Sequence, residues 1–225
     1  MLYIVPTPIG NIEDFSFRSI RILKESDLIL VENIFFSKKL LNYFNIDKPI
    51  KTYHIFNEHK IIHDILKKLK EGKILSLISN AGTPSISDPG YLLIKYCIKA
   101  KIEIDCLPGS TAFVPALVNS GFPINEFVFM GFLPSKNKRK KKLKYLSKEN
   151  KTIVLYESPH KLVKTLYDLQ LFLGLEKRIT ICRELSKKFQ EIIRGTIQEM
   201  TIYFNKNIPR GEFVIVLEGK KDKNK

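Results

Sequence analysis

The sequence contains few cysteines, and they stand far apart. The three are Cys97, Cys106 and Cys182, and no two of them form a Cys-x-x-Cys pair. Structural zinc sites and disulfide frameworks rely on more closely grouped or more numerous cysteines, so this spacing disfavours both. We therefore expect three reduced thiols, packed as small hydrophobic side chains in a protein of the reducing cytoplasm.

Long apolar segments are also absent. No hydrophobic run approaches the roughly 20 residues that a membrane-spanning helix needs. The opening residues, Met1–Pro6, carry no basic side chain and are too few for a secretory signal, so we expect a buried strand there. A hydrophobic content of 44% and a charged content of 27% are typical of a globular protein. We therefore expect a cytoplasmic protein with no membrane partner.

Acidic residues are much fewer than basic residues. The chain has 38 Lys and Arg residues but 23 Asp and Glu residues, which gives a formal net charge of +15. Such an excess suggests a polyanionic partner, of which nucleic acid is the commonest. The abundance of Lys, Ile and Asn also fits an AT-rich genome, which would add lysines everywhere regardless of function. Bulk charge alone leaves both explanations open.

The positive charge is concentrated in one segment. Residues 135–148 contain eight basic side chains in a stretch that can form a helix. A run this dense must be either solvated or turned towards phosphates. We expect it to contact RNA phosphates, whereas the basic end at 220–225 is expected to be a frayed tail. The side chains assigned to RNA are Lys136, Lys138, Arg139, Lys140, Lys141 and, from a separate segment, Arg183.

Short runs of Ile, Val and Leu alternate with longer segments of helical periodicity, and this pattern predicts an α/β fold. In the first half we expect a largely parallel five-stranded sheet, with strands at 2–5, 27–31, 50–53, 73–78 and 101–106. The helices of this half are expected at 15–25, 37–44, 59–71 and 88–100. In the second half we expect strands at 127–131, 151–156, 178–183 and 212–218. Its helices are expected over the basic segment, at 159–173 and at 197–204. A turn-rich stretch at 119–125 predicts two α/β domains, 1–120 and 121–225, with a ligand cleft between them.

Three loops rich in proline and glycine follow predicted strands of the first half. They are PTPIGN at 6–11, SNAGTPSISDPG at 79–90 and LPGSTA at 107–112. Because parallel strands end at one edge of a sheet, we expect these loops to meet there around a ligand. None contains the G-x-G-x-x-G or the Walker pattern, which disfavours a dinucleotide cradle and a P-loop. An adenosine-like ligand, held by backbone groups and small hydroxyls, is compatible with them.

Motifs along nearly the whole chain carry a family resemblance. In chain order they are LYIVPTPIGN (2–11), FRSIRILKESDLIL (17–30), AGTPSISDPGY (81–91), LPGSTAFVPALVNSG (107–121), FVFMGFLP (127–134), YESPHKL (156–162), RELSK (183–187), RGT (194–196) and PRGEFVIVLEG (209–219). Together they resemble the ribosomal RNA small-subunit methyltransferase I family, a branch of the tetrapyrrole methylases.

This resemblance implies a tetrapyrrole-methylase-like fold of two α/β domains, with S-adenosylmethionine held in the cleft between them. It implies methylation of the 2′-hydroxyl of a cytidine in the decoding region of 16S ribosomal RNA, by a homodimer. The residues that it assigns to the cofactor are Pro8, Ile9, Gly10, Ala81, Gly82, Thr83, Ile86, Thr111, Ala112, Phe132 and Gly211.

Two segments depart from the family pattern. Residues 32–35 are Glu-Asn-Ile-Phe where the family usually carries Glu-Asp-Thr-Arg, and residues 79–82 are Ser-Asn-Ala-Gly where it carries Ser-Asp-Ala-Gly. Both Asp-to-Asn changes remove a charge but keep the shape and hydrogen-bonding capacity of the side chain. The loss of Thr-Arg removes groups that could bind phosphate or carboxylate.

Removal of the hydroxyl proton calls for a general base. The candidates are Glu32, His160 and Glu184, followed by His54 and Glu58. Glu32 is preferred because it ends the second predicted strand, although it could instead cap the next helix. His160 could hydrogen-bond its own helix, and Glu184 could form a structural ion pair with Arg183. No zinc-like spacing joins the histidines, so we expect no metal.

Two other functions stay open on the sequence alone. A tetrapyrrole methyltransferase acting on a corrin or sirohaem precursor would share the cofactor loops, but it would not need a lysine-rich helix. A non-catalytic RNA-binding protein for ribosome assembly would explain the altered residues 32–35, but not the intact Ala-Gly-Thr-Pro at 81–84.

Overall fold

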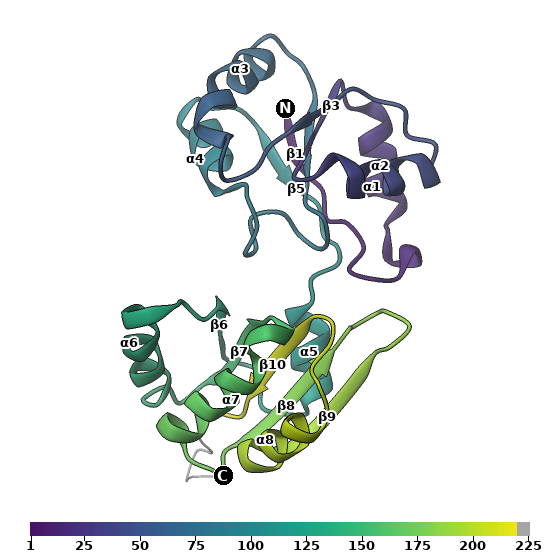
Figure 1. The fold of residues 1–225 in the computed structure, drawn as a ribbon. Coiled ribbons are helices and arrows are strands. Elements are labelled where there is room, and N and C mark those ends of the chain that lie inside the picture. Colours follow the sequence, from purple (N-terminus) through teal and green to yellow (C-terminus); the bar gives the residue numbers. More distant parts are fainter. Residues whose placement is uncertain (220–225) are drawn as a thin grey trace. The chain divides into compact units, whose positions relative to one another are not determined.

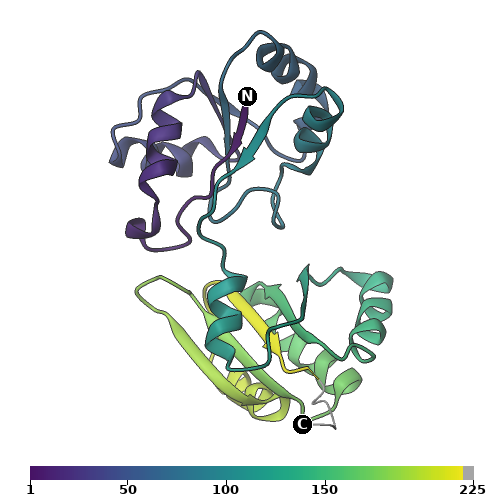
Figure 2. The same ribbon diagram turned by 180° about the vertical axis from the view of Figure 1, so that it is seen from behind.

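The computed structural model describes residues 1–219, and the expected tail at 220–225 lies outside the described part. The chain folds into two compact units, Met1–Thr111 and Ala112–Lys225, each with its own sheet (Figure 1, Figure 2). The division falls between Thr111 and Ala112 rather than near residue 120, because the helix that follows packs on the second sheet. Within 1–219, no helix is both long enough and apolar enough to span a membrane.

The first unit is built on a parallel sheet of five strands in the order β3-β2-β4-β1-β5, as the sequence predicts. The strands are β1 (Leu2–Ile4), β2 (Leu28–Val31), β3 (Ile50–Thr52), β4 (Leu75–Ile78) and β5 (Ile104–Cys106). Leu2 in β1 lies opposite both Leu75 in β4 and Ile104 in β5. Because all five strands run the same way, their carboxyl ends share one edge of the sheet.

Two pairs of helices cover the two faces of this sheet (Figure 1). They are α1 (Phe17–Glu25), α2 (Ile34–Tyr43), α3 (Glu58–Lys70) and α4 (Tyr91–Lys99), with a 3-10 turn, η1 (Ile12–Asp14), before α1. Leu23 of α1 and Leu41 of α2 belong to one buried core layer. Ile65 of α3 and Leu93 of α4 belong to the other. The chain thus changes face after β3, and the first unit is doubly wound.

The second unit has a mixed sheet in the order β6-β7-β10-β8-β9. Its strands are β6 (Phe127–Phe132), β7 (Thr152–Glu157), β8 (Arg178–Arg183), β9 (Glu191–Thr196) and β10 (Phe213–Leu217), and its helices are α5 (Phe113–Ser120), α6 (Lys136–Leu146), α7 (Pro159–Leu173) and α8 (Ile197–Lys206). Only β6 and β7 pair in parallel among these strands. Leucines of α6 and α7 and Phe204 of α8 share a core with Ile215 of β10, whereas α5 packs on the opposite face (Figure 2).

The predicted helices and strands are confirmed, with shifts of a few residues at their ends, but the sequence pattern does not predict α5 or β9. α5 has eight residues and contains Pro115, so its helical periodicity is too short to recognise. β9 is an edge strand that pairs with β8 alone, and its residues are half-buried or exposed. Its strand conformation comes from that pairing, because its own sequence lacks a buried apolar run.

Candidate active site

The loop after β1 is hydrogen-bonded to the loop after β4. The Thr7 N–H donates to the Gly82 carbonyl at 2.9 Å, and the Gly82 N–H donates to the Thr7 carbonyl at 3.0 Å. The buried Thr7 hydroxyl also donates to the Ser79 carbonyl at 3.2 Å. Gly82 has a φ of +82°, a left-handed conformation that glycine adopts without strain. Thr7, which no sequence pattern singles out, therefore joins these two loops.

The loop after β4 is joined in turn to the loop after β5. Thr83 Oγ1 donates to the Ser110 carbonyl at 3.0 Å and lies 2.8 Å from Thr111 Oγ1. Gly109 is so close to Pro6 that an added Cβ would come within 2.6 Å of that side chain. The three loops therefore meet at the carboxyl edge of the first sheet, as the sequence predicts.

Most residues assigned to the cofactor lie on these joined loops. They are Pro8, Ile9, Gly10, Ala81, Gly82, Thr83, Ile86 and Thr111. The polar groups that they offer are backbone amides, backbone carbonyls and two hydroxyls, all of them neutral. Ala112, Phe132 and Gly211 belong to the second unit, where Phe132 ends β6 and Gly211 precedes β10.

Glu32 stands at the same edge, directly after β2. It is half-buried, and its Oε2 accepts a hydrogen bond of 3.4 Å from the Asn80 N–H. The cap of α2 is Asn33, whose Oδ1 accepts from the N–H groups of Phe35 and Phe36 at 2.9 and 3.5 Å. The alternative role of Glu32 as a helix cap is therefore wrong, and its carboxylate lies beside the loop after β4.

Phe35 occupies the position where the family usually carries arginine. Its ring is 63% exposed, and Lys39 Nζ lies 4.3 Å from the ring centroid. Residues four apart on a helix share a face, so Lys39 supplies a positive charge beside this position. The loss of the arginine does not leave this face of α2 without a cation.

Glu184 is held by several contacts within the second unit. Its Oε1 accepts from the Glu212 N–H at 2.9 Å and from Lys187 Nζ at 2.9 Å. Partial burial acts to raise the pKa of Glu184, but these two hydrogen bonds outweigh it, and the pKa lies below its ordinary value. An added Cβ on Gly211 would come within 2.5 Å of the Glu184 carboxyl carbon. The carboxylate therefore supports the backbone at Gly211 and Glu212.

His160 and the remaining candidates occupy different surroundings. His160 is exposed near the start of α7. Glu58 accepts a hydrogen bond from the Tyr53 hydroxyl at 2.9 Å, so its carboxylate is already engaged. Arg183 donates to the Arg210 carbonyl at 2.8 Å and to Glu191 at 3.3 Å, rather than pairing with Glu184. The candidate bases therefore do not form one cluster: Glu32 lies in the first unit, and His160 and Glu184 lie in the second.

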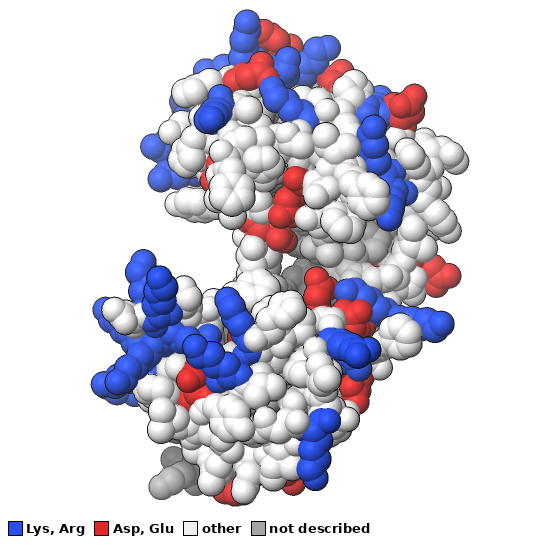
Figure 3. Space-filling model, in the orientation of Figure 1, with Lys and Arg blue, Asp and Glu red and all other residues white. Residues whose placement is uncertain are grey.

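The basic segment forms α6, as predicted, and it presents a dense group of exposed lysines (Figure 3). Lys136, Lys138, Lys140 and Lys141 are exposed on this helix. Arg139 is an exception, because it is only 8% exposed and turns inward. Its Nε donates to Asp168 at 2.6 Å and its Nη2 donates to the Thr165 hydroxyl at 2.7 Å, both on α7. The expectation that Arg139 contacts phosphate is therefore corrected: this side chain joins α6 to α7.

The described residues contain no metal-binding cluster. No group of three or more His, Cys, Asp or Glu side chains within 1–219 is arranged to hold an ion. Cys97 and Cys182 are buried free thiols, and burial raises the pKa of each to about 11. Cys106 is also free but exposed.

Comparison with known proteins identifies close relatives. The family described as Tetrapyrrole (Corrin/Porphyrin) Methylases matches residues 1–201. A ribosomal RNA small subunit methyltransferase I from Synechocystis sp. is 46% identical over 220 residues, covering 97% of this chain and 79% of that protein. A protein of the same name from Thermotoga maritima is 45% identical over 219 residues, covering 97% of this chain and 98% of that protein.

Solved structures share the fold at much lower identity. A cobalt precorrin-4 methyltransferase aligns with a TM-score of 0.72 and 16% identity, covering 96% of this chain and 94% of that one. A uroporphyrin-III C-methyltransferase from Thermus thermophilus, complexed with S-adenosyl homocysteine, aligns with a TM-score of 0.65 and 16% identity, covering 96% of both chains. These likenesses confirm the predicted fold. Because the relatives of high identity span nearly all of the chain, it belongs to the tetrapyrrole methylases and, within them, to the ribosomal RNA small subunit methyltransferase I family.

Proposed function

We propose that this protein transfers a methyl group from S-adenosylmethionine to the 2′-hydroxyl of a cytidine in the decoding region of 16S ribosomal RNA. The observation that carries the proposal is the identity of 46% and 45%, over nearly the full chain, to two proteins named ribosomal RNA small subunit methyltransferase I. The joined loops of the first unit and the exposed lysines of α6 support it, because they offer features that suit a nucleoside cofactor and a polyanionic substrate.

The joined loops fit this cofactor chemically. Its adenine and its methionine tail carry donors and acceptors that backbone groups at Ala81 and the hydroxyl oxygens of Thr83 and Thr111 can pair, whereas the backbone groups of Gly82 are already bonded to Thr7. When bound, the cofactor supplies a methyl group on a positively charged sulfur. We assign its contacts to Pro8, Ile9, Gly10, Ala81, Gly82, Thr83, Ile86 and Thr111, and from the second unit to Ala112, Phe132 and Gly211.

Glu32 is the proposed general base. As the ribose 2′-oxygen bonds to the methyl carbon and the bond from that carbon to sulfur breaks, with its electron pair left on the sulfur, the hydroxyl proton would pass to a carboxylate oxygen of Glu32. A well-placed general base accelerates such a step about 10²- to 10⁴-fold, and correct positioning of the reacting atoms contributes separately. Glu32 is favoured over Glu184, whose carboxylate is occupied by Lys187 and the Glu212 N–H. His160 is exposed and is the second candidate.

Phosphate contacts are assigned to the exposed side chains Lys136, Lys138, Lys140 and Lys141 of α6. Phosphate contacts fix the position of RNA on a protein and make its affinity depend on salt. Arg183 stays in the proposed RNA-binding set, since its hydrogen bonds to Glu191 and Arg210 still leave it half-buried at a basic surface.

A homodimer is also proposed. Large hydrophobic side chains of the first unit are exposed, among them Phe36 on α2, Phe56 before α3 and Tyr91 on α4. Exposed large apolar side chains are typical of surfaces that bind other proteins. Analytical ultracentrifugation measures the association directly.

We also propose that the protein is cytoplasmic, because its proposed substrate is ribosomal RNA.

Methyl transfer tests the proposed reaction. The purified protein is incubated with tritiated S-adenosylmethionine and small ribosomal subunits from a strain that lacks this modification. Label mapped to a cytidine 2′-oxygen is the expected result. In a parallel incubation with a corrin or sirohaem precursor in place of the subunits, label on a carbon atom of the tetrapyrrole would support that alternative. RNA binding without saturable cofactor binding would support a non-catalytic assembly protein.

A further inference from the structure

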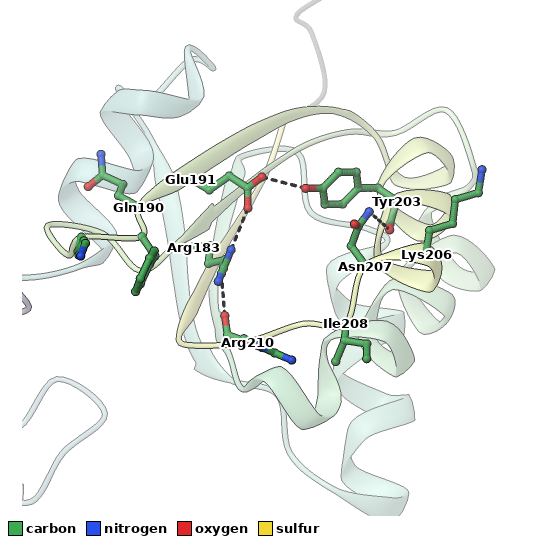
Figure 4. Close-up of a pocket in the computed structure, with 10 residues that line it drawn as sticks. Arg183, Gln190, Glu191, Tyr203, Lys206, Asn207, Ile208 and Arg210 are labelled. Carbon is green, nitrogen blue, oxygen red and sulfur yellow. Dashed lines mark hydrogen bonds and ion pairs between the residues drawn. The ribbon is translucent and has the colours of Figure 1, made fainter.

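The second unit contains a pocket whose lining residues are distant in sequence from the cofactor loops and from α6. Its volume is about 770 Å³, and it is formed by the end of β8, the loop from β8 to β9, α8 and the segment before β10 (Figure 4). Of the residues that line this pocket, only Arg183 belongs to the RNA-binding set predicted from the sequence. The chemistry of the other side chains is therefore not explained by the proposed active site.

The charge of this pocket is strongly positive. Lys188, Lys206 and Arg210 line it, and all three side chains are exposed. The lining carboxylate is Glu191, which is already bonded to Arg183. The lysines and Arg210 thus face solvent with an excess of positive charge, which favours an anionic ligand.

An exposed aromatic ring stands in the same pocket. Phe189, in the loop from β8 to β9, is 64% exposed, and Lys188 Nζ lies 5.7 Å from its ring centroid. Ile208 is 81% exposed. A flat apolar face beside cations is the combination that stacks an unpaired base while its phosphates are neutralised.

The wall behind these side chains is fixed by hydrogen bonds. Glu191 accepts from the Tyr203 hydroxyl at 2.9 Å and from Arg183 at 3.3 Å, and Arg183 also donates to the Arg210 carbonyl at 2.8 Å (Figure 4). β8, β9, α8 and the segment before β10 are therefore linked through one carboxylate and one guanidinium. The exposed cations therefore surround a frame that is held by hydrogen bonds within the protein.

We propose that this pocket binds a single-stranded segment of the RNA substrate, with a base stacked on Phe189 and phosphates contacted by Lys188, Lys206 and Arg210. The inference rests on the proposed function, because it deepens the assignment of ribosomal RNA as substrate. An open, basic surface with one exposed ring differs from the enclosed and mostly apolar pockets that bind small molecules. Duplex RNA hides its bases inside the helix, so a stacking platform favours unpaired nucleotides.

Fluorescence anisotropy tests the proposal with a labelled single-stranded RNA of about 12 nucleotides, a length within the usual range for such sites. We expect Phe189→Ala to weaken binding about 5- to 150-fold, and Phe189→Tyr to retain it, because tyrosine keeps the stacking face. We expect the double variant Lys188→Ala/Lys206→Ala to lower the salt dependence of log K by about 1.4, or about 0.7 for each lost phosphate contact.

The matched control is Lys24→Ala/Lys67→Ala, which removes the same charge from exposed positions on α1 and α3 of the first unit. RNA affinity that is equal in the wild type, Phe189→Ala and the lysine variant would overturn the proposal. It would also be overturned if adenosine monophosphate competes as strongly as the RNA, or if a duplex loses as much affinity as the single strand in Phe189→Ala.

Cofactor affinity and methyl transfer, measured on the same preparations, separate the two proposals. If Phe189→Ala loses RNA affinity while the wild type transfers no methyl group, the pocket stands and the proposed reaction fails. If methyl transfer to the small subunit proceeds normally in Phe189→Ala with unchanged RNA affinity, the reaction stands and the pocket assignment fails. Circular dichroism confirms that each variant is folded.

Discussion

The hydroxyl oxygens of Thr83 and Thr111 lie 2.8 Å apart and join the loop after β4 to the loop after β5. The Thr83 hydroxyl donates its hydrogen bond to the Ser110 carbonyl at 3.0 Å, so in the contact with Thr111 it is the acceptor. One side chain thus fixes two backbone segments at the edge where the cofactor is proposed to bind. Its removal should affect that site more than the rest of the unit.

Thr83→Val keeps the shape of the side chain but removes its hydroxyl. We expect a loss of about 1–2 kcal/mol in the free energy of unfolding, because the Ser110 carbonyl and the Thr111 hydroxyl lose their partner. We also expect weaker S-adenosylmethionine binding by isothermal titration calorimetry, with recovery in Thr83→Ser. Thr83→Trp should remain folded and bind no cofactor; normal affinity in that variant would place the cofactor elsewhere.

Glu32→Gln separates chemistry from binding. Glutamine can still accept the hydrogen bond from the Asn80 N–H, but it cannot take a proton at neutral pH. We expect kcat for methyl transfer to fall about 10²- to 10⁴-fold while the dissociation constant for S-adenosylmethionine is unchanged. Asn33→Asp is the control, because it preserves the α2 cap and should keep wild-type kcat. A Glu32→Gln enzyme with full kcat would show that another group removes the proton.

Glu184→Gln tests the support given to Gly211. The pKa of Glu184 is lowered in the folded protein, so ionised Glu184 contributes stability above the unfolded pKa of about 4.3, and this contribution is lost as pH falls through the folded pKa. We expect the variant to be about 1 kcal/mol less stable at pH 7, a modest value because the ion-pair partner Lys187 is partly exposed. Urea unfolding at pH 7 and pH 3 measures this, and a difference that persists at pH 3 would contradict the ionic origin.

The first sheet and its loops could be predicted from the sequence because the signals there are local. Buried strands such as β2 are continuous apolar runs, and parallel order brings the loops after such strands to one edge. The direction in which a side chain points depends on tertiary packing, which the local sequence does not specify. Arg139 and Lys140 are adjacent in a run of basic residues, yet one is buried against α7 and the other is exposed. By contrast, a local signal does favour Asn33 over its neighbour Glu32 as the cap of α2, because asparagine is a preferred residue at that position.

The pocket in the second unit could not be predicted for the same reason. Its parts come from the loop before β9, from α8 and from the segment before β10, and β9 itself is an edge strand without its own apolar pattern. Phe189 in isolation resembles any loop aromatic residue. Its position in one pocket with Lys206 emerges only when β8, β9 and α8 are packed together.

Arg139→Ala should lower stability and leave RNA affinity nearly unchanged, whereas Lys140→Ala/Lys141→Ala should do the reverse. Arg139→Ala removes the partner of the poorly exposed Asp168 and of Thr165, so we expect a loss of about 2–4 kcal/mol in the free energy of unfolding. The RNA affinity of the protein that remains folded should change little. The lysine pair is exposed, so we expect nearly unchanged unfolding in urea but weaker binding to small ribosomal subunits, with a smaller salt dependence. If Arg139→Ala instead weakened RNA binding as strongly as the lysine pair at equal stability, Arg139 would have to leave Asp168 and face the RNA in the complex.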